Sequence, residues 1–126
     1  MKDVILDAGA LIALERGEAS VRGYVVLAER GHTALTTSSA VVAQVWRGGA
    51  RQVRVARLLR SDLVDEVPLD AEMSRRIGIL AAAVGGTDVV DGHVAVLALE
   101  RDALVITSDP GDIARWGIAA ERIVPC

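Results

Sequence analysis

The fold is decided by the stretch Val4-Ile5-Leu6-Asp7-Ala8-Gly9-Ala10-Leu11-Ile12-Ala13-Leu14. A short apolar run ends in one acid, and a second apolar run with helical spacing follows almost at once. This pattern predicts a buried strand, a tight turn and a helix, with Asp7 at the carboxyl end of the strand. Ligands bind at that edge in open α/β sheets. Asp7 is therefore the first candidate for a functional side chain.

The remainder of the chain alternates short apolar strands with helical patterns. Strands are predicted at residues 3–7, 33–37, 63–67, 103–107 and 123–124. Helices are predicted at residues 10–15, 18–30, 40–47, 50–60, 70–84, from about 88 onward, and at 113–116. This alternation favours a three-layer α/β/α fold with a central parallel sheet flanked by helices. Nothing in the pattern divides residues 1–126, so a single domain is expected.

Composition narrows the class of protein. Hydrophobic residues make up 52% of the 126 residues, which is enough for a buried core. No apolar run approaches the roughly 20 residues needed to cross a bilayer, and the first residues do not look like a signal peptide. The single cysteine, Cys126, cannot form an internal disulfide, which fits a reducing compartment. We therefore expect a cytoplasmic protein that does not associate with membranes.

Basic residues are almost all arginine, since only Lys2 among the 14 basic residues is a lysine. Five of them recur every three or four residues without an intervening acid: Arg47, Arg51, Arg54, Arg57 and Arg60. Arginine suits bidentate contacts with phosphate, although a solvated helix face has the same pattern. On the opposite side of the predicted helix 50–60, the residues expected to face the core are Val53, Ala56 and Leu59.

Acidic residues recur at one edge of the predicted sheet. Asp7 follows the first strand, Asp109 follows the strand at 103–107, and Asp91 lies in the first turn of the helix that leads into that strand. Asp88 and Asp112 lie three residues from Asp91 and Asp109. Each acid alone could cap a helix or stabilise a turn. Together they would repel, and a bound Mg²⁺ or Mn²⁺ would offset that repulsion.

Other catalytic chemistries lack their residues. A glycine-rich phosphate loop is missing, because Gly9 stands alone. His32, in a turn, and His93, on the Asp91 helix, have no nucleophile placed beside them and favour surface or packing roles. A phospho-acceptor receiver domain needs a late lysine, and a haloacid-dehalogenase-like phosphatase needs an acid where Gly9 stands.

Four segments in order resemble one known family. They are 4–14, 39–49 (Ser-Ala-Val-Val-Ala-Gln-Val-Trp-Arg-Gly-Gly), 88–95 (Asp-Val-Val-Asp-Gly-His-Val-Ala) and 105–113 (Val-Ile-Thr-Ser-Asp-Pro-Gly-Asp-Ile). Together they resemble PIN-domain ribonucleases of the VapC type, the toxins of bacterial toxin–antitoxin pairs. The resemblance implies a Mg²⁺ pocket held by Asp7, Asp91 and Asp109, with Asp112 and Asp88 as further acids. It also implies RNA cleavage to 5′-phosphate and 3′-hydroxyl ends, a cognate antitoxin and a homodimer.

One catalytic position departs from the family, which normally has Glu where this chain has Gln44. An amide oxygen can ligate or accept a hydrogen bond, but it brings no charge, so the pocket would hold Mg²⁺ less tightly. The first hypothesis is a Mg²⁺-dependent endoribonuclease toxin. The alternative is a catalytically impaired PIN module that binds RNA or an antitoxin without turnover. Cleavage of DNA or flap structures ranks lowest, because the chain is too short for the arches of such enzymes.

For several polar and aromatic side chains near these segments, the sequence allows either a functional or a structural role. Thr107 and Ser108 could bond to a metal-bound water or a phosphate, or only to backbone groups at the strand end. Trp46 could stack on a base, although packing in the core or a dimer is favoured. Arg47, Arg51 and Arg54 are the candidate contacts to the RNA backbone.

Overall fold

The computed structural model describes residues 2–126, and within this range five strands form one parallel sheet in the order β3-β2-β1-β4-β5. The central strand β1 (Val4–Leu6) lies between β2 (Leu35–Ser38) and β4 (Leu104–Thr107). The edges are β3 (Val64–Val67) and β5 (Ile123–Pro125). Helices flank this sheet on both faces, which confirms the predicted three-layer α/β/α architecture.

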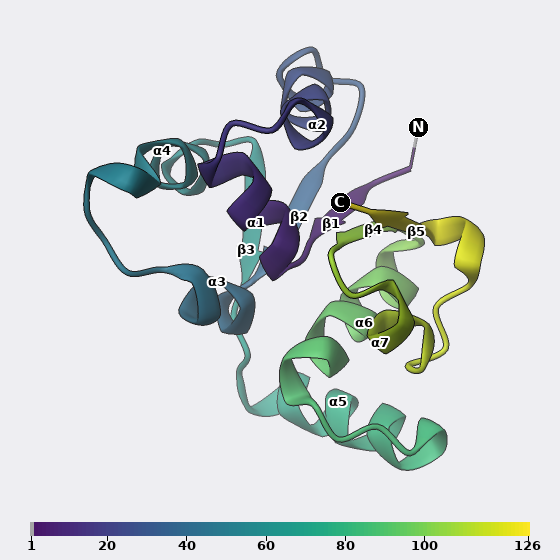
Figure 1. Ribbon diagram of the computed structural model, residues 1–126. Coiled ribbons are helices and arrows are strands. Elements are labelled where there is room, and N and C mark those ends of the chain that lie inside the picture. Colours follow the sequence, from purple (N-terminus) through teal and green to yellow (C-terminus); the bar gives the residue numbers. More distant parts are fainter. Residues whose placement is uncertain (1) are drawn as a thin grey trace.

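Nine helical segments connect the strands within residues 2–126. They are α1 (Ala8–Glu15), α2 (Ala19–Glu29), α3 (Ser39–Val45), the 3₁₀ turn η1 (Ala50–Gln52), α4 (Val53–Arg60), α5 (Ala71–Val84), α6 (Val89–Arg101), α7 (Pro110–Ala114) and the 3₁₀ turn η2 (Ala120–Arg122). Helices α1, α2 and α4 pack together on one side of the sheet, and α5, α6 and α7 pack on the other (Figure 1). Helix α3 contacts both α1 and α6, so it stands between the two groups.

The strand register brings three chain segments to the same edge. Leu6 of β1 pairs with Thr37 of β2 and with Ile106 of β4. The residues that follow them in the chain therefore lie at the same level, at the carboxyl edge of the sheet. Two of the sequence-predicted site residues, Asp7 and Thr107, are placed in this way by neighbouring strands.

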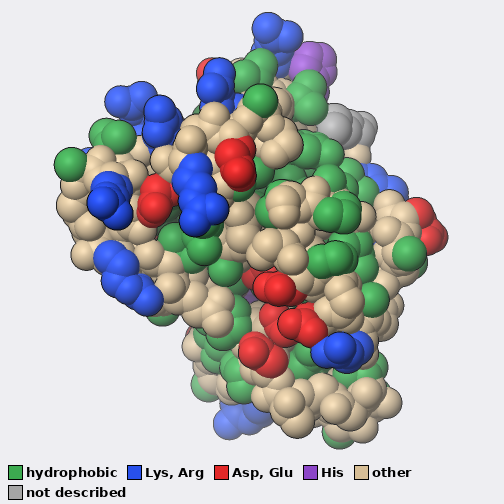
Figure 2. All heavy atoms as spheres, in the orientation of Figure 1, with side chains coloured by type: hydrophobic (Ala, Val, Ile, Leu, Met, Phe, Trp, Pro, Cys, Tyr) green, Lys and Arg blue, Asp and Glu red, His purple; other side chains and the backbone are tan. Residues whose placement is uncertain are grey.

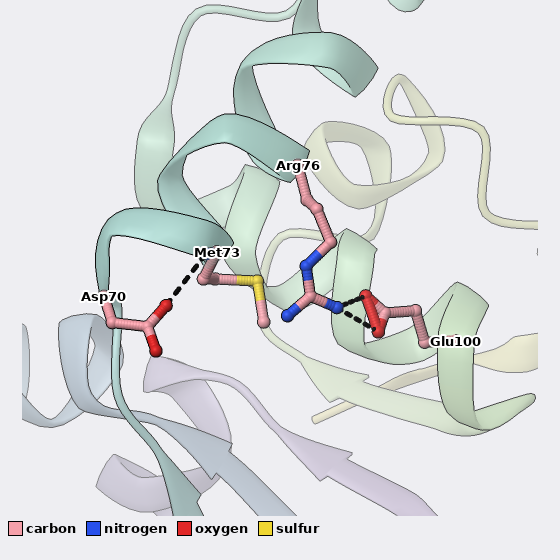
Figure 3. Close-up of polar contacts among 4 residues, drawn as sticks. All are labelled: Asp70, Met73, Arg76 and Glu100. Carbon is pink, nitrogen blue, oxygen red and sulfur yellow. Dashed lines mark hydrogen bonds and ion pairs between the residues drawn. The ribbon is translucent and has the colours of Figure 1, made fainter.

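Helix α6 is buried over most of its length, because it lies between the sheet, α5 and α7. Every residue from Gly92 to Ala98 is buried. Helix α5 is anchored to it by an ion pair between Arg76 and Glu100 (Figure 3). The start of α5 is capped, since the Asp70 carboxylate accepts a hydrogen bond of 2.8 Å from the Met73 amide (Figure 3). The buried middle of α6 thus fixes the direction of the helix whose first turn carries Asp91.

The helices of residues 2–126 are short. No single helix there is both long and apolar enough to cross a bilayer. Only α5 and α6 taken together reach the required length and composition, and the two are bent by 96° at their junction.

The predicted core face of α4 is wrong. Val53 is 53% exposed, whereas Val55 and Leu58 are buried. The reason is that residues 50–60 do not form one continuous α-helix, because the 3₁₀ turn η1 precedes α4 and turns Gln52 inward. The buried stripe therefore begins at Gln52 and continues through Val55 and Leu58. The arginines of α4 remain exposed, as predicted.

Candidate active site

Asp7 lies at the N-cap position of α1, yet its side chain is not used for capping. In the described chain, its carboxylate makes no capping hydrogen bond to the second or third residue of the helix. Instead the Thr107 hydroxyl donates to Asp7 Oδ2 at 2.7 Å. Both side chains are buried. The simple capping interpretation of Asp7 therefore fails, and its carboxylate stays oriented toward the end of β4.

The Thr107 hydroxyl connects two of the predicted acids. Its oxygen accepts a hydrogen bond of 3.0 Å from the Asp109 amide while its proton is donated to Asp7. Asp109 occupies the N-cap position of α7 without a side-chain capping bond within residues 2–126. Thr107 thus fixes the Asp7 carboxylate relative to the backbone that carries Asp109. Ser108 is exposed, and its hydroxyl lies 3.5 Å from Asp109 Oδ2.

A glycine allows β1 and β4 to bring their loops so close. A Cβ atom added at Gly9 would lie 2.4 Å from Ser108 Oγ and 2.7 Å from the Ser108 backbone nitrogen. Real Cβ atoms essentially never approach other atoms so closely, and a backbone atom cannot rotate away. Gly9 is therefore required for the first turn of α1 to pack against the loop that carries Asp109.

The two acids of α6 have different roles. The Asp88 carboxylate accepts hydrogen bonds from the Val90 and Asp91 amides at 2.9 and 3.0 Å, so it caps the helix as predicted. Asp91 makes no side-chain hydrogen bond or ion pair within the described residues. Burial, followed by the charges of Asp88, Asp7, Asp112 and Asp109 in that order, raises the pKa of Asp91 to about 6. Asp91 therefore carries a charge that its surroundings do not neutralise.

The pKa of Asp7 is also raised from its ordinary value. Burial is the largest cause, and the nearby charges of Asp109 and Asp88 add to it. Hydrogen bonds from Thr107 and the Ala8 amide act in the opposite direction. These mutual effects show that the acids lie within electrostatic range of one another.

We refer to Asp7, Asp91 and Asp109 as the acidic edge. Acidic side chains gather in one area of the face drawn in Figure 2.

The acidic edge suits a divalent cation by its chemistry. Its donors are carboxylate oxygens, which Mg²⁺ and Mn²⁺ prefer. The pKa values of Asp7 and Asp91 are raised first by burial and then by neighbouring carboxylates, and a cation would neutralise that negative charge. No three His, Cys, Asp or Glu side chains of residues 2–126 already stand at the distances that would ligate one ion. Ion binding would therefore require side-chain rotation. Asp112 is partly engaged elsewhere, because it pairs with Arg115 at 2.6 Å.

Gln44 is exposed near the end of α3 and lines a polar hollow together with arginines. Arg47 and Arg51 line the same hollow, whereas Arg54 donates to the Glu15 carbonyl at 3.1 Å. Trp46 is 40% exposed, so it does not pack in the core of this chain, while its packing in a dimer stays a prediction. The reason is that α3 ends one residue earlier, at Val45, and the chain turns outward.

His93 joins two elements beside the site, a link that its sequence position did not reveal. It is fully buried, and its Nδ1 lies 2.6 Å from Ser38 Oγ. The Ser38 oxygen accepts from the Ala40 and Val41 amides, so it donates its own proton to His93. Burial first, and the Arg76 charge second, lower the pKa of His93. A neutral, packed His93 agrees with the predicted structural role and connects α6 to the start of α3.

Comparison with known proteins identifies the fold family. A family model described as the PIN domain matches residues 4–117. The fold is similar to that of VapBC2 from Rickettsia felis, solved bound to a DNA fragment from their promoter, with a TM-score of 0.65, 16% identity and coverage of 98% of this chain and 96% of that one. It is also similar to FitAcB from Neisseria gonorrhoeae, with a TM-score of 0.59, 20% identity and coverage of 96% of each chain. Among curated proteins, none matches this sequence. Because the family model spans nearly the whole length, this chain belongs to the PIN domain family.

Proposed function

We propose that this chain is the toxin of a toxin–antitoxin pair and a metal-dependent endoribonuclease. PIN domains of the VapC type are generally nucleases that use divalent metals, and this chain has both the family match and the shared fold. The observation that carries the proposal is the acidic edge. Its carboxylates come from three separate segments, and burial together with the neighbouring carboxylates raises the pKa values of Asp7 and Asp91. None of the three is used as a helix cap in the part of the chain that the structure describes.

In the proposed mechanism, Asp7, Asp91 and Asp109 would hold Mg²⁺ or Mn²⁺. A bound divalent cation lowers the pKa of a water molecule and neutralises charge on the phosphoryl group that is attacked. The protein's contribution is to hold the carboxylates in place. Thr107 restrains Asp7 through its hydroxyl, and the Asp88 cap fixes the helix turn that carries Asp91. Such supporting contacts typically contribute about 10- to 100-fold to metal affinity or activity.

The direct test is cleavage of a labelled RNA in the presence of Mg²⁺, Mn²⁺ or EDTA. Cleavage should depend on the metal and should be lost in Asp7→Asn, which removes the charge and keeps the side-chain shape. Asp62→Asn is the matched control, because Asp62 is exposed and lies in the connection between α4 and β3. Equal cleavage with and without the Asp7 carboxylate would contradict the proposal.

A second candidate function is RNA or antitoxin binding without turnover, and it is favoured by the uncharged Gln44 at a position where the family has Glu. Replacement by the family residue separates the two candidates. If Gln44→Glu strengthens Mg²⁺ binding in calorimetry and increases RNA cleavage and growth toxicity, the natural chain is an attenuated nuclease. If neither measurement changes, residue 44 is not part of the catalytic machinery.

The proposed antitoxin would bind the groove between α2 and α4. This groove has a volume of about 270 Å³, with Leu14, Val25, Leu58 and Leu63 forming apolar lining. Its charged lining residues are three arginines, Arg22, Arg54 and Arg57, and one acid, Glu29, so the groove is basic on balance. An amphipathic segment with acidic residues at its edges would match this pattern.

The groove is tested with the product of the neighbouring gene, co-purified with this chain. Val25→Asp should abolish that complex while RNA cleavage by the free chain persists. Ile79→Asp on α5 is the control, because Ile79 is 74% exposed. Helix α5 packs on the other side of the sheet from α2 and α4 (Figure 1). If Val25→Asp retains the complex, the antitoxin binds another surface.

Light scattering of the purified chain checks the proposed homodimer.

A further inference from the structure

A polar hollow of about 390 Å³ lies between the end of α1 and the loop that follows α3. Its polar lining comprises Glu15 and Arg16 from the end of α1, Gln44 from α3, and Arg47, Arg51 and Gln52 from the loop and η1. We call this site the arginine hollow. It shares no lining residue with the acidic edge, although Gln44 stands where the family has its catalytic Glu.

The frame of the arginine hollow is built by one buried side chain. Gln52 is only 4% exposed, and its Nε2 donates to Glu15 Oε1 at 2.9 Å and to the Val45 carbonyl at 2.8 Å. Its Oε1 accepts from the Arg47 amide at 2.8 Å and the Gly48 amide at 3.0 Å. All four hydrogen bonds of the amide group are thus made. They fix the end of α1 to the loop, so the hollow has a defined shape.

The charge of this hollow is unbalanced. Three arginines, Arg16, Arg47 and Arg51, face one acid, Glu15, which leaves a formal charge of +2. None of the three arginines forms an ion pair within residues 2–126. Arg47 donates only to the carbonyls of its own helix end, including that of Trp46 at 2.7 Å. The guanidinium groups therefore keep donors available for an anion.

Two neighbouring residues indicate which anion fits. Trp46 directly precedes Arg47 in the chain and exposes 40% of its surface, although it lies outside the set of residues that line the hollow. Arginines beside an exposed aromatic ring are typical of sites that hold single-stranded nucleic acid, where a base stacks on the ring and the phosphate meets the charge. Gln44 adds amide donors without adding negative charge. A glutamate there would reduce the formal charge of the hollow from +2 to +1.

We propose that the arginine hollow binds a phosphodiester group of single-stranded RNA, with the adjacent base stacked on Trp46. This inference rests on the proposed function, because it places the substrate backbone of that nuclease along the loop after α3. It also assigns Gln44 a binding role, in which its lack of charge favours the phosphate.

The test measures binding of fluorescein-labelled hexauridylate by anisotropy in EDTA, where no metal is present and cleavage does not interfere. The double variant Arg16→Ala/Arg51→Ala should weaken binding by about tenfold at low salt and reduce the salt slope by about 1.4, since each phosphate contact contributes about 0.7 on a single strand. Trp46→Ala should weaken binding by about tenfold, the effect of losing one stacked base. Gln44→Glu should also weaken binding under these conditions.

The charge-matched control is Arg30→Ala/Arg75→Ala. It removes two exposed arginines, one at the end of α2 and one on α5. Binding by the control should keep the parent affinity to within about twofold, after allowance for the loss of general charge. Equal weakening by both double variants would overturn the subsite and leave only diffuse attraction. Arginine-dependent binding of a hexaglutamate peptide, with RNA binding unchanged, would assign the hollow to an acidic protein segment instead.

The outcomes separate this inference from the proposed function. If the parent chain cleaves RNA with metal and the hollow variants bind hexauridylate like the parent, the subsite is wrong while the nuclease stands. If the parent neither binds nor cleaves RNA, both are wrong. Thermal unfolding of each variant should match the parent, since the substituted arginines and Trp46 are surface residues.

Discussion

The acidic edge and the arginine hollow are built in opposite ways. The acids stand at the ends of buried strands and in the first turn of a buried helix, where burial first, and the neighbouring carboxylates second, raise the pKa of Asp91 to about 6. The arginines project from exposed positions, and only the frame beneath them is buried. The comparison indicates that the negative site lowers the stability of the folded protein, because its acids are held close together by the fold. The positive site costs little stability, because its arginines are exposed, so they can be replaced more easily.

The largest effect that would test this contrast is expected for Asp91→Asn. Metal-dependent RNA cleavage should fall by about 100-fold or more, because charge stabilisation by a bound metal contributes several kcal/mol. The same variant should melt at a higher temperature at pH 8, since an uncompensated charge is removed. Cleavage assays and calorimetric melting measure the two effects. A lower melting temperature would show that the Asp91 charge is already neutralised in the folded protein.

Gly9→Ala should destabilise the protein by about 1–3 kcal/mol, because the new methyl group must displace the Ser108 backbone. The same change at Gly23 in α2 is the control, since a Cβ there meets no atom within 4 Å. Gly23→Ala should stabilise the helix by about 0.5–1 kcal/mol. Urea unfolding measures both. Equal behaviour of the two variants would mean that the acidic edge does not depend on this close approach.

Gln52→Leu should cost about 1–3 kcal/mol, because the Arg47 and Gly48 amides lose their buried acceptor. Gln44→Leu on the exposed surface should change stability by less than about 0.5 kcal/mol. Mg²⁺ binding should survive in Gln52→Leu, while affinity for hexauridylate falls. If Mg²⁺ binding is lost as well, the two sites are coupled and the contrast between them breaks down.

The smallest effect concerns the pH dependence of stability in EDTA. Because the pKa of Asp91 rises from 3.8 to about 6 on folding, the folded protein binds more protons than the unfolded chain between these values. Its contribution to stability is therefore full below pH 3.8 and is lost as pH rises through about 6. Asp88→Asn keeps a good capping residue but removes the second-largest cause of the shift. Urea titrations from pH 4 to 8 should show a weaker loss in this variant.

Most of the acidic edge could be predicted from the sequence, because it depends on the ends of regular elements. Asp7 and Asp109 follow apolar strands, and parallel strands end at a common edge. The sequence could not tell which acids cap helices, since that depends on side-chain rotamers. Asp88 proved to be a cap, whereas the side chain of Asp7 is held by Thr107.

The arginine hollow could not be predicted as a unit. Arg16 and Arg51 are 35 residues apart in the sequence, and packing of α1 against the loop after α3 brings them together. Gln52 gives no sequence signal, because its role requires four partners from three segments. The same inward turn of Gln52 shifted the buried face of α4 away from Val53. Local periodicity fails where a 3₁₀ turn interrupts the helix.

Trp116 has a consequence for how the chain can vary. Its buried ring fills the space that side chains at Gly86 and Gly92 would occupy, since a Cβ at either position would lie 2.5 or 2.7 Å from the indole. The side chain of Trp116, just after α7, thus occupies the space that side chains before and at the start of α6 would need. A Cβ at Gly92 would also lie 2.7 Å from Ile77 Cγ2, so alanine there should be tolerated only if both Trp116 and Ile77 give way. A change at one of these positions therefore requires a change at another, and Gly92 directly follows Asp91 in the chain.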